Sequence, residues 1–211
     1  MKKIIKDGFL ISVEGVDGSG KSSFCKLLEK RLSSDFSLVL TKEPGGTLLG
    51  KSLRNLLLHS NQEWDCKAQF LLFAADRAQH FSEVVIPALK NNMIVLSDRM
   101  ADSSLVYQGY VKKLPIDLLD TINRWAMQQR VPDITFFLDI DEKTVFERMA
   151  IRNIPDDTFE KNRSEISVRI QGFKNLFATR KNVYRLDATH SCEELSNEAL
   201  AHLHSLFEHL S

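Results

Sequence analysis

The chain has 211 residues, of which 43% are hydrophobic, so it can bury one substantial core, and we expect a single domain over residues 1–211. Its 28 lysines and arginines balance 28 aspartates and glutamates, which excludes the basic excess typical of a protein that binds nucleic acid. Any site for a polyanion must therefore be local and built from a few cations.

The N-terminal residues have only a faint likeness to a secretion signal. Residues 1–3 carry two lysines, but the apolar stretch that follows is bracketed by Asp7 and Glu14 and is far too short. No apolar run approaches the ~18 residues that crossing a bilayer requires. The cysteines are odd in number and lack metal-ligand spacing, which favours reduced packing residues (Cys25, Cys66 and Cys192). We expect a cytoplasmic protein without a membrane partner.

Short β-branched and aromatic runs alternate along the chain with longer segments of helical periodicity. The expected strands cover residues 9–13, 36–40, 93–96, 134–138 and 182–186. The expected helices cover residues 21–32, 48–58, 68–79 and 116–129, and a last helix follows the capping box of Ser191 and Glu194. This alternation predicts an α/β three-layer sandwich, in which helices cover both faces of a parallel five-stranded sheet.

A glycine-rich sequence, GVDGSGKS, joins the first expected strand to the first expected helix and matches G-x-x-x-x-G-K-[ST]. Its glycines let backbone N–H groups converge on phosphate oxygens, at the positive end of the following helix. Lys21 can balance charge on the β- and γ-phosphates, and the hydroxyl of Ser22 can ligate Mg²⁺. We expect a donor site for ATP with Mg²⁺, or for GTP. Its residues are Gly15, Val16, Asp17, Gly18, Ser19, Gly20, Lys21, Ser22 and Ser23.

Such a P-loop does not by itself separate a kinase from a GTPase switch or a motor, but four further elements do. They are KEPGGT (residues 42–47) with Arg54 behind it, LLFAADR (71–77), SDRMADSSLVYQG (97–109) and PDITFFLD (132–139). In order and spacing, over nearly the whole length, the chain resembles the thymidylate kinase family of P-loop nucleoside monophosphate kinases. The resemblance implies transfer of the γ-phosphate of ATP to dTMP, giving dTDP and ADP for dTTP synthesis, and a homodimer formed by helices beside the acceptor site.

The resemblance also implies roles around the acceptor nucleotide. Asp17 would accept a hydrogen bond from the deoxyribose 3′-hydroxyl, Arg54 would hold the acceptor phosphate, and Tyr107 would lie against the 2′ position. Phe73 and Arg77, four residues apart on one helical face, would stack on thymine and donate to its O4 atom. Cytosine would be excluded because its amino group is itself a donor. The other implied substrate contacts are Glu43, Pro44, Arg99, Ser103, Ser104 and Gln108.

Several of these residues also have a simpler structural interpretation. Asp17 can be a turn residue that stabilises the loop backbone, and Arg54 a solvated surface charge. Phe73 can belong to an apolar stripe of the core, formed by Phe70, Leu71, Phe73 and Ala74.

The catalytic residues implied for phosphoryl transfer are cations and one carboxylate. Asp98 follows the third strand, where a P-loop fold places a carboxylate beside Mg²⁺, and Arg99 would bridge the donor and acceptor phosphates. The acceptor is a phosphate monoester that is already ionised, so catalysis reduces to alignment and charge neutralisation. The charge would be neutralised by Lys21, by Arg99, by Mg²⁺ near Ser22 and Asp98, and by a lid arginine.

Two positions depart from the family pattern. Met100 stands where tyrosine or histidine is common, and Gly18 stands where some members carry an arginine. The missing cation would come from a lid at about residues 148–160, which we expect to be a mobile excursion over the edge of the sheet. Arg152 is the first candidate and Arg148 the second; Arg163 and Arg169 come after them.

Two other functions stay open. A deoxynucleoside kinase would share the P-loop but must deprotonate a 5′-hydroxyl, so it needs a base beside its acceptor; Arg54 instead favours a phosphorylated acceptor. A nucleotide-binding module without catalysis would fit the scarcity of arginines in the lid.

Overall fold

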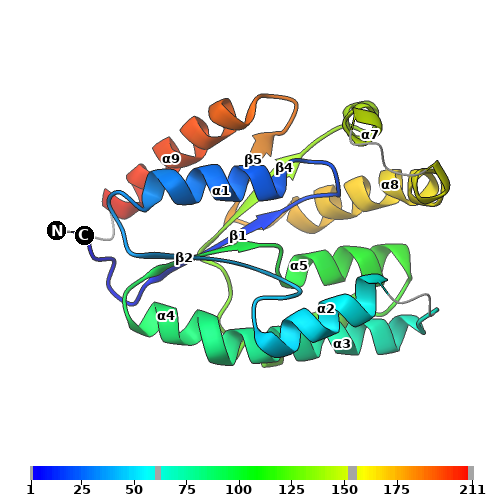
Figure 1. The fold of residues 1–211 in the computed structure, drawn as a ribbon, viewed down its shortest axis with the longest axis horizontal. Coiled ribbons are helices and arrows are strands. Elements are labelled where there is room, and N and C mark those ends of the chain that lie inside the picture. Colours follow the sequence, from blue (N-terminus) through cyan, green and yellow to red (C-terminus); the bar gives the residue numbers. More distant parts are fainter. Residues whose placement is uncertain (1, 60–62, 152–155, 209–211) are drawn as a thin grey trace.

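The computed structural model describes residues 2–59, 63–151 and 156–208, without the side chains of residues 58–59 and 156–164. Five strands form one parallel sheet in the order β2-β3-β1-β4-β5 (Figure 1). They are β1 (Phe9–Glu14), β2 (Leu38–Lys42), β3 (Ile94–Asp98), β4 (Ile134–Asp139) and β5 (Val183–Asp187). The predicted parallel sheet is confirmed, and each strand lies within about two residues of its expected range.

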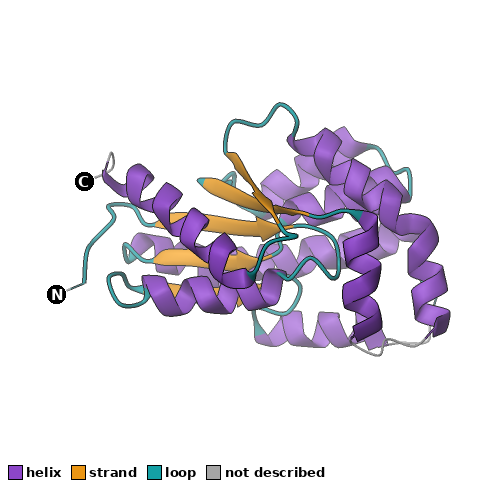
Figure 2. Cartoon of the chain, turned by 90° about the horizontal axis from the view of Figure 1, so that it is seen from above, coloured by secondary structure: helices purple, strands orange, loops and turns teal. Residues whose placement is uncertain are grey.

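Helices connect the strands and cover both faces of the sheet. They are α1 (Lys21–Leu32), α2 (Leu48–His59), α3 (Cys66–His80), α4 (Ile86–Lys90), α5 (Ala101–Ser104), α6 (Ile116–Ala126), α7 (Glu142–Ile151), α8 (Asp156–Phe177) and α9 (Cys192–Glu208). Two π-helical stretches, η1 (Phe81–Val85) and η2 (Leu105–Val111), continue α3 and α5. Figure 1 shows α1 and α9 on one face of the sheet and α4 on the other, and in Figure 2 further helices lie beyond the arrowheads of the strands.

All residues of the central strand β1 are buried, and most of them are apolar. Ile11 and Val13 pack into the core that α1 and α9 cover, whereas Leu10 points to the opposite face and packs with Phe81 and Val85. Burial on both faces favours such a largely apolar sequence, and Ser12 and Glu14 are the buried polar residues within it.

The expected capping box at the start of α9 is confirmed. The N–H of Ser191 donates to a carboxylate oxygen of Glu194 at 2.9 Å, and the N–H of Glu194 donates back to Ser191 Oγ at 3.3 Å. At the start of α3, the carboxylate of Asp65 accepts from two backbone N–H groups in the same way.

Two expectations about the helices were wrong in extent. The helix expected at 116–129 ends at Ala126, because Gln128 and Gln129 take left-handed backbone conformations. The helix expected at 68–79 lies within α3, the first part of a continuous helical stretch from Cys66 to Lys90. Of the expected lid, residues 156–160 belong to the start of α8, and residues 152–155 lie outside the described part of the chain.

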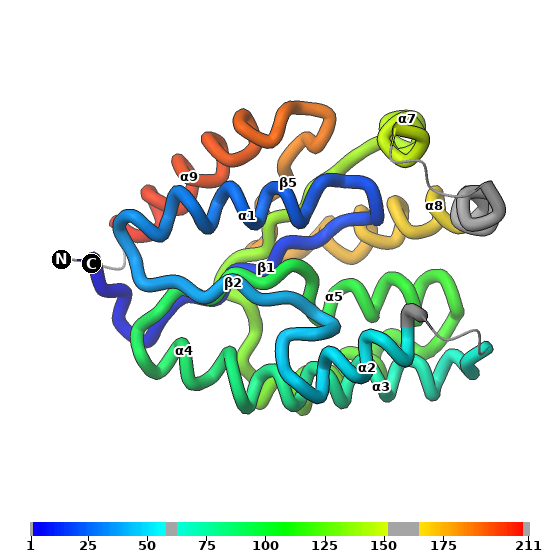
Figure 3. Tube along the Cα trace, in the orientation of Figure 1, coloured from blue at the N-terminus to red at the C-terminus, as the bar shows by residue number. Residues whose placement is uncertain are grey.

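The tube in Figure 3 shows α2 and α3 running side by side. Gly50 on α2 permits this close approach, since a Cβ at that position would lie 2.3 Å from Asp76 Oδ1 on α3. The packing brings the loop after β2 against α3. Within the described residues, no helix combines the length and apolarity that crossing a membrane requires.

Candidate active site

The glycine-rich loop turns sharply from β1 into α1. Gly15, Gly18 and Gly20 all have positive φ angles, and Gly20 is the left-handed residue directly before α1. A Cβ on Gly15 would lie 2.8 Å from the carbonyl oxygen of Leu138 on β4. Side chains are therefore excluded where the loop backbone must approach both the sheet and a phosphate.

Lys21 is buried at the base of this loop. Its ammonium donates to the carbonyl oxygen of Val16 at 2.7 Å. Burial and the neighbouring charge of Arg99 lower the pKa of Lys21 to about 8, against the opposing effect of Asp17 and Asp98. A nearby polyphosphate would favour the charged form of this amine.

Ser22 and Asp98 fit a magnesium site. The hydroxyl of Ser22, in the first turn of α1, donates to Asp98 Oδ2 at 2.6 Å, at the carboxyl end of β3. Mg²⁺ prefers oxygen ligands and is held by one or two protein groups together with phosphates and water. The described residues contain no group of three or more His, Cys, Asp or Glu side chains able to hold a metal.

One cavity of about 310 Å³ joins the loop to the acceptor elements. It is lined by Asp17, Gly18, Gly20, Lys21, Ser22, Ser23, Lys42, Glu43, Arg54, Asp98, Arg99 and Met149. The structure thus brings together the residues that the sequence assigned to donor, metal and acceptor phosphate. Lys42 was not predicted, although it is paired in register with Asp98 at the same edge of the sheet.

Arg99 lines the cavity, and its backbone adopts a left-handed conformation with a φ of 71°. Its guanidinium donates to Asp17 Oδ1 at 2.5 Å, to Ser103 Oγ at 2.8 Å and to the carbonyl oxygen of Gly15 at 3.0 Å. The hydroxyl of Tyr107 donates to Asp17 Oδ2 at 3.0 Å. Burial raises the pKa of Asp17, but the charge of Arg99 outweighs it and holds this pKa well below its usual range.

Glu14, the last residue of β1, was not predicted to belong to the site. Its carboxylate accepts from the N–H of Met100 at 2.8 Å and from Ser103 Oγ at 2.6 Å. Burial and the neighbouring Asp102 raise the pKa of Glu14 to about 7, although Arg99 acts in the opposite direction. Glu14 thereby ties the strand before the loop to the segment that carries Arg99.

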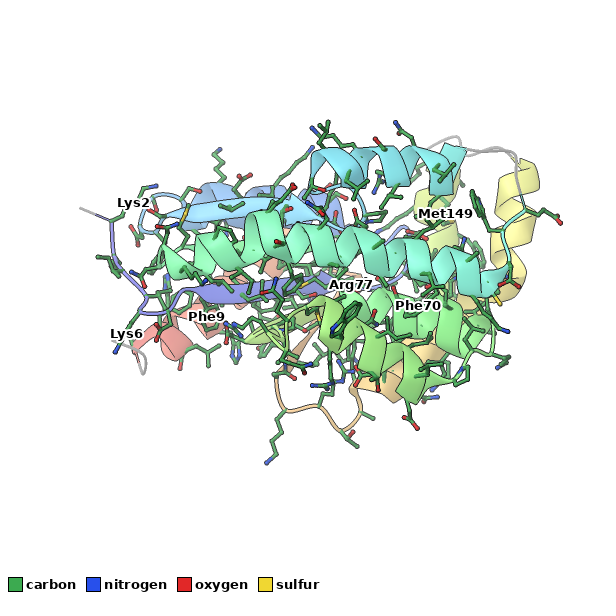
Figure 4. The ribbon with its side chains drawn as sticks, turned by 90° about the horizontal axis from the view of Figure 1, so that it is seen from below. Lys2, Lys6, Phe9, Phe70, Arg77 and Met149 are labelled. Atoms are coloured by element: carbon green, nitrogen blue, oxygen red, sulfur yellow. The ribbon has the colours of Figure 1, made fainter. Side chains whose placement is uncertain are left out.

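Arg77 lies on α3 and is only 2% exposed (Figure 4). It is therefore held by protein groups on most sides. Its Nε donates to Glu43 Oε2 at 2.9 Å, and its two terminal nitrogens donate to Asn123 Oδ1 at 2.6 Å and Ser104 Oγ at 3.3 Å. Glu43 Oε1 also accepts from Nδ1 of His80 at 2.9 Å, because a carboxylate can only accept. Sequence analysis missed both Asn123 and His80.

The loop after β2 is held against its neighbours by its backbone. The N–H of Gly45 donates to Asp76 Oδ1 at 3.0 Å, and the carbonyl oxygen of Pro44 accepts from Arg54 at 2.9 Å. Arg54 therefore points back over the loop and into the cavity, and it is not a solvated surface charge.

Two further predicted residues differ in their surroundings. Phe70 and Ala74 belong to the core, whereas Phe73 is half-buried and lies outside the described core clusters. Gln108 is buried; its Nε2 donates to Gln69 at 3.1 Å, and its Oε1 has no hydrogen-bond partner among the described residues.

The predicted lid is described only in part. Arg148, on α7, donates to the carbonyl oxygens of Ala188 at 2.7 Å and Ser19 at 3.3 Å. The guanidinium of Arg169, on α8, lies 4.8 Å from the ring centre of Tyr107. Arg152 and the side chain of Arg163 lie outside the described residues.

Comparison with known proteins finds similarity over nearly the whole chain. The sequence model of the family described as thymidylate kinase matches residues 13–199. A thymidylate kinase of Halothermothrix orenii is 43% identical over 195 residues, covering 90% of this chain and 94% of that protein. One from Aster yellows witches'-broom phytoplasma is 38% identical, covering 94% and 98%. A crystal structure of thymidylate kinase from Ehrlichia chaffeensis superposes with a TM-score of 0.74 at 31% identity, covering 93% of this chain and 98% of that one.

Proposed function

The chain belongs to the thymidylate kinase family, and from this premise we propose how its own residues transfer the γ-phosphate of ATP to dTMP. The observation that carries the proposal is the single cavity lined by the P-loop, by the pair Ser22 and Asp98, and by Arg54 and Arg99. Donor and acceptor phosphates can meet there without leaving the protein. The proposed unit is one P-loop kinase domain over residues 1–211, with its lid at about 148–160.

The donor half of the cavity suits ATP with Mg²⁺. Backbone N–H groups of the loop and the N-terminus of α1 would bind the phosphates, and Lys21 would balance their charge. Mg²⁺ would be held by Ser22 and Asp98 and, when bound, neutralises charge on the β- and γ-phosphates. These residues fix the γ-phosphoryl group in place before transfer.

The acceptor phosphate would lie between Arg54 and Arg99. A phosphate monoester is ionised at neutral pH, so its oxygen can attack without losing a proton to the protein. Arg54 and Arg99 then have two roles: they align that oxygen with the γ-phosphorus, and they offset the charge that two phosphate groups bring together. In a cavity that excludes water, such contacts reach several kcal/mol.

The base would be read by Arg77 and Gln108. A guanidinium has five N–H groups, and three of those on Arg77 donate to acceptors among the described residues, which leaves one N–H on each terminal nitrogen for a ligand. Gln108 Oε1 is an acceptor without a partner among the described residues. Arg77 as donor would match O4 of thymine, and Gln108 Oε1 as acceptor would match its N3–H. Cytosine presents the reverse, a donor amino group beside an acceptor nitrogen, and would be rejected. Phe73, half-buried on α3, would stack on the ring.

The sugar would lie against Tyr107 and Asp17. The ring of Tyr107 would close the 2′ side, and Asp17 would accept from the 3′-hydroxyl. Ser103 and Ser104 would line the same pocket.

Two carboxylates beside the proposed acceptor, Glu43 and Asp17, are ion-paired, and this argues against a nucleoside kinase. Both oxygens of Glu43 are engaged by Arg77 and His80, and these partners lower its pKa even though burial alone would raise it. Asp17 is paired with Arg99 and Tyr107. Neither group is suited to take a proton from a 5′-hydroxyl.

We further propose a cytoplasmic homodimer without a nucleic-acid partner. Leu71 on α3 is 55% exposed, and Leu118 and Trp125, seven residues apart on α6, are 55% and 74% exposed. Residues seven apart lie on one helical face, and α3 packs against α6. This apolar surface suits a second copy of the chain.

A coupled ADP-release assay tests the proposed function. Wild-type protein with ATP and Mg²⁺ is offered dTMP, dUMP, dCMP, dGMP, dAMP and thymidine, and GTP replaces ATP in a parallel series. Turnover with dTMP supports the proposal. Turnover with thymidine alone would favour the nucleoside kinase, and no turnover with any acceptor would favour the binding module.

A further inference from the structure

Asn123 is a completely buried amide on α6, and it lies outside the lining of the cavity. Its Oδ1 accepts from a terminal nitrogen of Arg77 at 2.6 Å, and its Nδ2 donates to the carbonyl oxygen of Ala101 at 3.4 Å. A buried amide is unfavourable unless it is hydrogen-bonded, so these bonds explain why the position tolerates asparagine.

Three segments that are distant in sequence hold the guanidinium of Arg77. Glu43 follows β2, Ser104 ends α5 and Asn123 lies on α6, and each provides an acceptor to a different nitrogen. Because the guanidinium is a rigid planar fork, three acceptors define its plane. The bond to Asn123 is the shortest of the three.

Asn123 differs from the other two acceptors in one respect. Glu43 lines the cavity, and Ser104 is proposed above as a substrate contact. Asn123 has no exposed surface, so its influence on a bound base must pass through Arg77.

Building on the proposed function, we propose that Asn123 is a positioning residue that sets base specificity. It fixes the plane of Arg77 so that the remaining N–H groups meet an oxygen on the acceptor base. An amino group at that position then faces donors that cannot turn away, which rejects cytosine. Without Asn123 Oδ1, the terminal nitrogen must find another acceptor, and the guanidinium gains the freedom to turn.

The test compares wild-type protein with Asn123→Ala and Asn123→Asp, using dTMP and dCMP as acceptors. In Asn123→Ala the KM for dTMP rises about tenfold or more, and the preference for dTMP over dCMP in kcat/KM falls by about tenfold, as expected when a hydrogen bond to a charged group no longer holds Arg77. The KM for ATP is unchanged. Asn123→Asp keeps an acceptor in place and restores the KM for dTMP to within about threefold of wild type.

Two controls separate positioning from loss of folding. Leu119→Ala removes a buried apolar side chain from the same helix and takes no hydrogen bond from Arg77, so it lowers the Tm and leaves the base preference intact. In an Arg77→Ala background, Asn123→Ala causes no further change in preference, because the residue through which it acts is gone. If Asn123→Ala does not fold, Asn123→Ser takes its place, since the shorter hydroxyl cannot reach the guanidinium.

An unchanged base preference in the folded variant overturns the inference, as does a loss of preference that persists without Arg77. If wild-type protein does not turn over dTMP, the proposed function itself is wrong. Efficient turnover of dTMP with an unchanged preference in Asn123→Ala overturns the positioning role alone.

Discussion

Ion pairing and burial determine the protonation states of the side chains in the site. Glu43 and Asp17 are paired with arginines that keep them ionised, so both serve as fixed acceptors. Lys21 has its pKa lowered to about 8 and Glu14 has its pKa raised to about 7, both first of all by burial. The same burial would strengthen the contact of charged Lys21 with a phosphate.

Arg77→Ala is expected to affect both substrate binding and stability. Loss of its donors should raise the KM for dTMP by about tenfold or more, while the P-loop and the KM for ATP are untouched. The substitution also leaves Glu43 buried without its strongest partner, so the free energy of unfolding should fall by about 3 kcal/mol or more. Steady-state kinetics and urea denaturation measure the two effects. An unchanged KM for dTMP would remove Arg77 from base recognition.

Glu14→Gln is expected to change how stability depends on pH. The pKa of Glu14 in the folded protein is about 7, above its ordinary value of 4.5, so between these pH values the folded state binds more protons than the unfolded state. The contribution of Glu14 to the free energy of unfolding is therefore largest below pH 4.5. It falls by up to about 1 kcal/mol per pH unit as the pH rises toward 7.

The glutamine variant lacks this loss, so its stability relative to wild type should increase from pH 5 to pH 7 and then level off. Denaturant titrations of both proteins at pH 5, 6, 7 and 8 measure the difference. Parallel curves would mean that Glu14 does not titrate in this range.

The helices around the acceptor site depart from regular α geometry where they carry candidate contacts. Tyr107 and Gln108 both lie in the π-helical stretch η2, which follows directly from α5. Such stretches are often found at functional sites, because they re-aim side chains relative to a regular helix. Arg99, just before α5, adopts a left-handed conformation that is unfavourable for a residue with a Cβ.

The lid arginines are expected to differ in their contributions. Arg152→Ala should lower kcat by about 10³-fold with little change in nucleotide Kd, because a lid cation acts mainly on the charge that develops during transfer. Arg148→Ala should cost less, since its guanidinium is bonded to two backbone carbonyls. Lys143→Ala, an exposed cation on the same helix α7, is the matched control. A kcat near wild type in Arg152→Ala would shift the role to Arg163 or Arg169.

At the scale of the whole molecule, the sheet could be predicted from the sequence, but the buried polar contacts could not. Short apolar runs predict the strands, because burial on both faces of the sheet leaves a local signal in the sequence, and the glycine-rich loop predicts the helix that starts at Lys21. The three side-chain acceptors of Arg77 come from residues 27, 34 and 46 positions away, and His80 lies 37 positions from Glu43. No local pattern encodes such pairs, since they form only once α3, α6 and the loop after β2 are packed together.

The apolar surface on α3 and α6 predicts the state of association. Leu118→Glu combined with Trp125→Glu should convert a dimer to a monomer, because charges would be buried at the centre of the interface. Ile4→Glu, at 73% exposure, is the matched control on a different surface. Sedimentation measures the mass. A double variant that sediments like wild type would place any interface elsewhere.

Direct transfer between two nucleotides in one cavity is the central claim, and the fate of a labelled phosphate tests it. Wild-type protein is incubated with dTMP, Mg²⁺ and ATP labelled at the γ-phosphate, and the products are separated. The account predicts that the label appears in dTDP in step with ADP release, and that Arg54→Ala slows this transfer by about tenfold or more. Label released as inorganic phosphate, with no labelled dTDP, would contradict it.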